Sequence, residues 1–185
     1  IGMVHQHFML VDDFTVLDNV LLGAEGGWSL ARGRNLARQE LSRLAEGYGL
    51  SVPLNERVGD LPVGVQQRVE ILKALYRGAR LLILDEPTAV LTPREADALF
   101  VLLRRLRDEG RAVILVTHKL REVMAVTDAV TVLRHGGVVG NFATRQTSVE
   151  ELATCMVGRP VALRAEHVAR APGAVVLEAR GLEAV

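Results

Sequence analysis

Two adjacent carboxylates, Asp85 and Glu86, close a run of apolar residues and are the residues of this sequence best placed to do chemistry. The run, residues 81–84, shows no alternation of apolar and polar side chains, which predicts a strand buried on both faces of a parallel sheet. The acids then fall at the carboxyl edge of the sheet, where open α/β sheets bind ligands. One carboxylate can hold a magnesium ion while its neighbour orients a water, as nucleotide hydrolysis requires.

Two further polar residues follow apolar segments in the same way. Gln6 stands in a polar stretch near the end of the short strand predicted at 1–8, and His118 comes just after a predicted strand at 112–116. Taken singly, an acid pair at a strand end is often only solvated, and an isolated glutamine or histidine is more often a surface residue. Their order along the chain is what makes the combination informative.

The segments that must position these residues alternate between expected strands and helices. We expect helices at about 15–22, 34–48, 65–77 and 93–110 and a last one opening at Ser148, strands at 81–84 and 112–116, and a β-hairpin of 129–133 and 138–142 around Gly136-Gly137. Thr15, Thr92 and Ser148 are suitable N-caps, and Pro93 suits a first helical position. The strand–helix–strand order from 81 to 116 predicts a parallel crossover.

Bulk composition excludes several classes of protein. The chain has 185 residues with 22 basic and 22 acidic side chains, so no excess of positive charge indicates nucleic acid as a main partner. Cys155 is the one cysteine, which rules out a disulfide within the chain and a thiolate metal cluster. The longest apolar runs, such as 98–103, are far shorter than the roughly 18 to 20 residues that span a bilayer.

The ordered motifs resemble the nucleotide-binding domain of ABC transporters over roughly residues 1 to 160. The segments that carry the resemblance are 4–8 for the Q-loop, 61–68 for the signature, 81–88 for Walker B, 89–92 for the D-loop and 116–118 for the switch-histidine strand. The amino-acid sequence at 3–10, 69–76 and 89–93 is similar to that of the first cassette in importers that carry two cassettes in one chain. These importers form the sugar and nucleoside uptake branch of the family. The resemblance implies an α/β fold: a partial P-loop NTPase with a parallel sheet core, an α-helical subdomain at about 9–78 and a C-terminal β-hairpin.

The resemblance also implies a role for each site residue. Asp85 would hold Mg²⁺ with ATP, Glu86 would polarise the attacking water, His118 would contact the γ-phosphate, and Gln6 would touch the metal or the water. The nucleotide-binding residues of the signature, acting in trans, would be Pro62, Val63, Gly64, Val65 and Gln66, and the D-loop would be Ala89, Val90, Leu91 and Thr92.

Three departures from the family pattern stand out. Pro62 and Val63 replace the usual serine and glycine, so a hydroxyl and an amide hydrogen that normally grip the γ-phosphate are missing. Thr92 stands where an aspartate is common. A phosphate loop of the form G-x-x-x-x-G-K-[ST] is not present in the 185 residues, so we expect this chain alone to bind ATP poorly and not to hydrolyse it.

The expected organisation is that of a fragment running from the Q-loop of a first cassette to the start of a second. Residues 1–158 would be the C-terminal part of the first nucleotide-binding domain, 159–173 a linker, and 174–185 the first strand of a second domain. The partners implied are the second cassette in a head-to-tail arrangement, polytopic permease subunits and, indirectly, an extracytoplasmic solute-binding protein, with no nucleic acid. The implied location is the cytoplasmic face of the inner membrane.

Two alternatives stay open at this point. One is a soluble ABC-type ATPase that acts on ribosomes or DNA, although such proteins are expected to carry a long charged insertion where this chain has the short span 24–60. The other is a purely interacting fragment without catalysis. Trp28 and its neighbouring glycines, in the arm between Q-loop and signature, are a candidate docking point for the membrane subunits.

Overall fold

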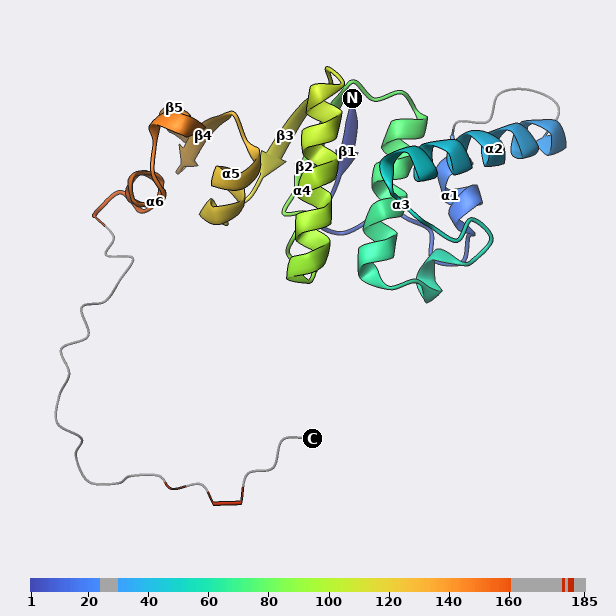
Figure 1. Cartoon of the computed structure of the whole chain (residues 1–185), viewed down its shortest axis with the longest axis horizontal. Helices are drawn as coiled ribbons and strands as arrows, with labels where there is room; N and C mark the ends of the chain where they lie inside the picture. Colours follow the sequence, from blue (N-terminus) through green and yellow to red (C-terminus); the bar gives the residue numbers. More distant parts are fainter. Residues whose placement is uncertain (24–29, 161–177, 179, 182–185) are drawn as a thin grey trace.

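The computed structural model describes residues 1–23, 30–160, 178 and 180–181 (Figure 1). Its elements, in chain order, are β1 (Gly2–Val4), α1 (Val16–Leu21), α2 (Leu30–Tyr48), α3 (Val63–Tyr76), β2 (Leu81–Asp85), α4 (Pro93–Asp108), β3 (Ala112–Val116), α5 (Leu120–Val126), β4 (Ala129–Arg134), β5 (Gly137–Ala143) and α6 (Val149–Val157), with 3-10 turns at Val58–Asp60 and Thr144–Gln146. Every element expected between residues 1 and 158 is confirmed, with shifts at some boundaries. Most of the expected linker at 159–173 and most of the expected strand at 174–185 lie outside the described residues. Trp28 lies outside them as well.

The central sheet is parallel, in the order β1-β2-β3. Val4 pairs with Leu84, and Asp85 pairs with Val116, so the three strands end at nearly the same level. The segments after all three strands therefore leave the sheet at one edge, which confirms the predicted parallel crossover.

One face of this sheet is covered by α3 and α4. Leu82 and Leu84, both 1% exposed, pack there with Ile71 of α3 and with Leu103 and Leu106 of α4. Burying these alternate residues of β2 fixes which face of the strand points inward.

The expectation that the strand at 81–84 is buried on both faces is wrong. Leu81 and Ile83 are only partly buried, and Ile114 and Val116 of β3 are each 48% exposed. The physical reason is that both helices pack on the same face, and among the described residues no element covers the other. The continuous apolar run thus predicted the strand correctly, but it did not show that only one of its faces is covered by helices.

A second cluster of buried residues lies among the first three helices, which occupy one end of the molecule in Figure 1. Val16 and Leu17 of α1, Leu41 of α2 and Leu72 of α3 are fully buried in it. This helical layer matches the predicted subdomain in its content. The predicted domain boundaries themselves stay predictions.

At the opposite end, β4 and β5 form the predicted antiparallel hairpin, and α6 packs against it. The turn consists of His135 and Gly136, which both have positive φ (51° and 79°), rather than Gly136-Gly137 as expected, and β5 already begins at Gly137. Two left-handed residues give a turn whose twist matches that of the paired strands. The short helix α5 was not expected, because Lys119 before it offers no side-chain cap.

The predicted caps are confirmed. Thr15 and Ser148 accept the backbone N–H three residues on, from Asp18 and Glu151, and Thr92 forms a complete capping box with Glu95. Helix α3 starts at Val63, two residues before the expected start at 65, because Pro62 can occupy the N-cap position without making a side-chain bond.

Candidate functional site

The acid pair and the histidine meet at the carboxyl edge of the sheet. Asp85 is the last residue of β2, and His118 follows the end of β3 by two residues. The His118 Nδ1 atom lies 2.8 Å from Glu86 Oε1, although the two residues are 32 positions apart. The histidine side chain is 71% exposed to solvent and the glutamate side chain 19%, so a ligand in solvent can reach the histidine more easily than the glutamate.

Glu86 itself has an unusual backbone. Its φ is +46°, a left-handed value that residues with a side chain rarely adopt. Its N–H donates to the carbonyl of Val116 at 2.9 Å, which extends the pairing of β2 with β3 by one residue. This bend turns the side chain out of the strand and toward His118.

The second carboxylate oxygen of Glu86, Oε2, is buried and has no hydrogen-bond partner among the described residues. An unpaired buried acceptor costs about 1 to 3 kcal/mol relative to a satisfied one. A water or a hydroxyl that donates to this oxygen would remove that cost. The geometry therefore suits a carboxylate that accepts a proton from a bound nucleophile.

Asp85 offers a single partly buried carboxylate at the strand end. Within the described ranges, no group of three or more His, Cys, Asp or Glu side chains lies close enough to hold a metal ion without other ligands. A lone carboxylate fits Mg²⁺, because this ion usually keeps several waters and takes only one or two protein carboxylates together with phosphate oxygens.

Gln6 follows the end of β1 by two residues, just as Glu86 follows the Leu84 that pairs with Val4. Parallel strands that are in register place Gln6 at the same edge as the acids. Its side chain is exposed in the loop beyond the strand. The structure thus brings Gln6 to the edge without placing it in contact with Glu86 or His118.

The residues predicted to form the signature surround the start of α3. Pro62 and Val63 are exposed, Gly64 is buried, and Val65 and Gln66 are partly buried. The Gln66 side chain donates to the carbonyls of Val58 and Leu61 at 3.2 and 2.9 Å, so its amide is already engaged within the chain. The helix begins without a side-chain cap, because Pro62 at the N-cap position has no hydroxyl.

Gly64 lies directly against the N-terminal turn of α4. A Cβ atom at this position would come within 2.4 Å of Glu95 Oε1, while Glu95 Oε2 accepts from the Thr92 N–H at 3.0 Å and from its hydroxyl at 2.8 Å. These bonds from Thr92, with a further contribution from the charge of Arg68, lower the pKa of Glu95. Gly64 of the predicted signature is therefore in contact with Glu95, whose carboxylate is bonded to Thr92, the last residue of the predicted D-loop. In that predicted loop Ala89, Val90 and Thr92 are exposed and Leu91 is partly buried.

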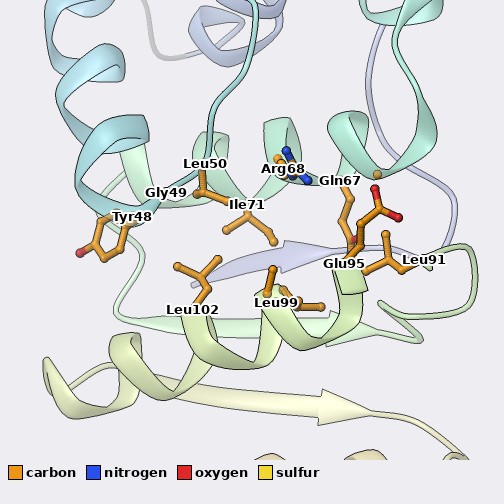
Figure 2. A pocket seen from close by; sticks show the side chains of 12 residues that line it. Tyr48, Gly49, Leu50, Gln67, Arg68, Ile71, Leu91, Glu95, Leu99 and Leu102 are labelled. Carbon is orange, nitrogen blue, oxygen red and sulfur yellow. The ribbon is translucent and has the colours of Figure 1, made fainter. Parts of the chain in front are cut away.

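A cavity of about 120 Å³ lies beside this contact, between α3 and α4 (Figure 2). Figure 2 shows Gln67 and Glu95 together at one end of it, Tyr48 at the other, and Leu99 and Leu102 facing it from α4. Neither Glu86 nor His118 lines it. The cavity is thus a gap between packed helices and does not include the Glu86–His118 contact.

Sequence reasoning missed the residues that hold the turn after Glu86. The Gln67 side chain, 3% exposed, donates to the carbonyl of Pro87 at 2.6 Å. Lys119 Nζ donates to the carbonyl of Thr88 at 2.9 Å, and the Thr88 hydroxyl donates to Glu122 at 2.7 Å. The spacing of Gln67 offered one signal. It is a polar residue three positions after Gly64 and four before Ile71, so helix geometry places it on the buried face of α3, where a polar side chain needs a hydrogen-bond partner.

The helices of the described residues include none that is both long enough and apolar enough to cross a membrane.

Comparison with known proteins identifies the family. The family model described as "ABC transporter" matches residues 1–89. The chain is 50% identical, over 98% of its length, to a nucleoside import ATP-binding protein of Lactococcus lactis, and 48% identical, over its whole length, to a glucose import ATP-binding protein of Haloferax volcanii. A ribose import ATP-binding protein of Pseudomonas putida is 38% identical over 98% of the chain. The chain spans 36 to 38% of the length of these curated relatives.

Solved structures agree on the fold. An inward-facing ABC transporter of the metal-chelate type superposes with a TM-score of 0.72 at 23% identity, covering 86% of this chain and 64% of the other. A bacterial ABC transporter cassette solved as a dimer gives a TM-score of 0.65 at 26% identity, covering 80% of this chain and 64% of the other. With its α/β fold, its ordered motifs and these relatives, the chain belongs to the ABC transporter ATP-binding family.

Proposed function

We propose that this chain is part of the ATP-binding and ATP-hydrolysing subunit of an ABC importer, which couples ATP hydrolysis to the uptake of a simple sugar or a nucleoside. The observation that carries the proposal is the contact between Glu86 and His118 at the carboxyl edge of the sheet, with a buried carboxylate oxygen left free. The printed names of the curated relatives, which import nucleosides, glucose and ribose, support the importer class and the solute class.

In this proposal Glu86 is the general base and His118 keeps it oriented. Glu86 would take a proton from the attacking water through Oε2, a contribution of about 10² to 10⁴ in rate. His118 is largely exposed, so it would also reach the transferred phosphoryl group and donate to the charge that develops there. Gln6, at the same edge, would contact the metal or the water.

Asp85 would hold the magnesium ion through a water, and the ion would neutralise charge on the β- and γ-phosphate oxygens. Asp85 is partly buried at the end of β2, so its carboxylate lies at the same edge as Glu86.

The signature residues Pro62, Val63, Gly64, Val65 and Gln66 would close the nucleotide site of a second cassette in a head-to-tail pair. The first turn of α3 still offers the helix dipole and the amides near Gly64, but the hydroxyl and amide hydrogen of the usual serine are missing. We infer weaker γ-phosphate binding at that composite site than at its twin. The D-loop, Ala89, Val90, Leu91 and Thr92, would communicate between the two sites.

The partners would be the second cassette of the same chain and polytopic permease subunits at the cytoplasmic face of the inner membrane, with a solute-binding protein acting indirectly. Nucleic acid is not among the proposed partners. The neutral charge balance of the chain supports that choice.

The test uses the full-length protein purified with its membrane subunits in lipid vesicles. Glu86→Gln should lower ATP turnover by about 10² to 10⁴ and abolish uptake of labelled nucleoside or sugar, while ATP binding persists. Glu150→Gln, at an exposed carboxylate of α6, is the matched control and should leave turnover unchanged. Unchanged turnover in Glu86→Gln would refute the assignment, and co-purification with ribosomes or DNA in place of membrane subunits would refute the importer.

The 185-residue chain without further segments should bind Mg-ATP poorly, because it contains no lysine-bearing phosphate loop. Calorimetric titration of this chain with Mg-ATP measures the affinity directly. Micromolar binding would contradict this part of the proposal.

A further inference from the structure

The two residues that follow Glu86 are held from both sides by side chains of distant elements. Pro87 accepts a hydrogen bond from Gln67 of α3 at 2.6 Å. Thr88 accepts one from Lys119 at its carbonyl, 2.9 Å, and donates one from its hydroxyl to Glu122 of α5, 2.7 Å. Pro87 and Thr88 are therefore anchored to the helix that carries the signature and to the segment that directly follows the switch histidine.

Three of the four side chains in these bonds are well sheltered. Thr88 is 2% exposed and Gln67 3%, and the Glu122 side chain is 13% exposed, whereas that of Lys119 is 37% exposed. Lys119 Nζ also reaches the Thr88 hydroxyl at 3.0 Å and Glu122 at 3.5 Å, so a positive and a negative group share one buried hydroxyl. Hydrogen bonds to charged groups in such surroundings are among the stronger ones in proteins.

The segment they hold is strained. Glu86 has a left-handed backbone, a state that costs of the order of 1 to 3 kcal/mol for a residue with a side chain and persists only where the surroundings enforce it. Its own N–H and C=O are bound to Val116 and Ala89, and its carboxylate contacts His118. The side-chain bonds to the next two residues add a further constraint, because they fix the chain directly after Glu86.

We propose that Gln67, Lys119 and Glu122 form a clamp on Pro87 and Thr88 whose role is to hold the Glu86 carboxylate against His118. The three are positioning residues: they act through the backbone of the turn and do not touch the nucleotide. Because Lys119 directly follows His118, the same clamp ties both members of the Glu86–His118 contact together. This inference rests on the proposed function for its effect on turnover, and on the structure alone for its effect on the turn.

Thr88 offers a matched pair of substitutions. Thr88→Val keeps the shape and removes the hydroxyl, whereas Thr88→Ser keeps the hydroxyl. In the full-length protein with its membrane subunits, Thr88→Val should lower kcat for ATP by about 10- to 100-fold, the effect of a misplaced catalytic group, with little change in KM. Thr88→Ser should restore most of the loss. Gln67→Met, which removes the donor to Pro87 at nearly constant volume, should lower kcat in the same way.

The control is Thr144→Val in the hairpin region. Thr144 is 4% exposed and its hydroxyl is bonded to that of Thr127 at 2.9 Å, so the substitution removes a hydroxyl of similar burial that makes no bond to the turn after Glu86. It should leave kcat and KM unchanged. A loss of kcat in Thr144→Val equal to that in Thr88→Val would show a general stability effect and overturn the clamp, as would wild-type kcat in both Thr88→Val and Gln67→Met.

Hydrogen exchange in the same full-length protein gives a readout that does not need turnover. The Ala89 N–H donates to the carbonyl of Glu86 at 3.1 Å, so a loosened turn should exchange this amide at least several-fold faster in Thr88→Val and Gln67→Met, but not in Thr144→Val. If the wild-type protein does not hydrolyse ATP, the proposed function fails, and exchange at Ala89 still decides the clamp. Unchanged exchange in both variants overturns it; should Thr88→Val not fold, Gln67→Met decides alone.

Discussion

Asn19 has a buried side-chain amide, and its replacement should lower the free energy of unfolding. The hydrogen bonds that it makes allow the size of this effect to be estimated. It is 1% exposed on α1 and fixes the loop that leads from Gln6 to that helix. Its Oδ1 accepts from the Val11 N–H at 2.8 Å, and its Nδ2 donates to the carbonyls of Val11 at 3.0 Å, Thr15 at 3.2 Å and, more weakly, Phe14 at 3.4 Å. Asn19→Ala removes the acceptor and both amide hydrogens at once.

The partners left behind determine the magnitude. The carbonyls of Thr15 and Phe14 still accept the backbone N–H groups of Asn19 at 2.9 Å and of Val58 at 3.0 Å, so neither is orphaned. Val11 is 39% exposed, so water can reach its backbone groups and the full desolvation penalty does not apply. At a net value of about 1 kcal/mol per lost bond, Asn19→Ala should lower the free energy of unfolding by about 2 to 3 kcal/mol.

Urea unfolding of the chain at pH 7, followed by circular dichroism, measures this difference from the shift in midpoint at constant slope. Asn141→Ala is the control, because Asn141 is an exposed amide of β5 that accepts one bond from Thr131. It should change the free energy of unfolding by no more than about 0.5 kcal/mol. The reasoning would be refuted by a cost for Asn19→Ala no larger than that of the control.

Asn19→Asp adds a pH test with a definite sign. The carboxylate keeps the acceptor for Val11 but loses the donor and faces three carbonyl oxygens, which should raise its pKa in the folded state. Its destabilisation should therefore be full at pH 7 and shrink as the pH falls through that raised pKa, because the protonated acid can donate again. A deficit that grows on acidification would contradict this geometry.

Three further predictions concern other parts of the fold. Gly64→Ala should lower the urea midpoint in the wild-type background, because its Cβ would meet Glu95, and should not lower it in a Glu95→Ala background, where the obstacle is gone; equal shifts in both would contradict the contact. Asp18→Asn should destabilise the chain above about pH 4 and cost progressively less below it. Burial would raise the pKa of Asp18, but hydrogen bonds from the Thr15 hydroxyl and from Arg34 outweigh it and hold the pKa below its usual value. The stabilisation by the ionised carboxylate is therefore lost on acidification, and unfolding measured from pH 7 to pH 2 should show this loss. Leu106→Ala, at a fully buried core position of α4, should cost about 2 to 5 kcal/mol in the same assay, against less than about 1 kcal/mol for Val101→Ala on the exposed side of that helix.

The helices and their starts were predictable because the signals are local. Thr15, Thr92 and Ser148 each precede a helix and accept an N–H within the next three residues, so no distant contact is needed to place them. The convergence of Glu86 and His118 was also predictable, since the parallel crossover between their strands forces both to one edge of the sheet. The start of α3 was misplaced because proline at an N-cap position leaves no side-chain bond to signal it.

The sequence by itself determined the parallel sheet, the capped helices and the edge at which Asp85, Glu86, Gln6 and His118 gather, because periodicity, caps and strand order are properties of neighbouring residues. Only the tertiary structure decided which face of the sheet is covered and which side chains hold the turn after Glu86. Gln67, Lys119 and Glu122 reach that turn across 20 to 34 positions of the chain. Such contacts depend on the rotation and depth of each packed helix, which short-range patterns do not specify.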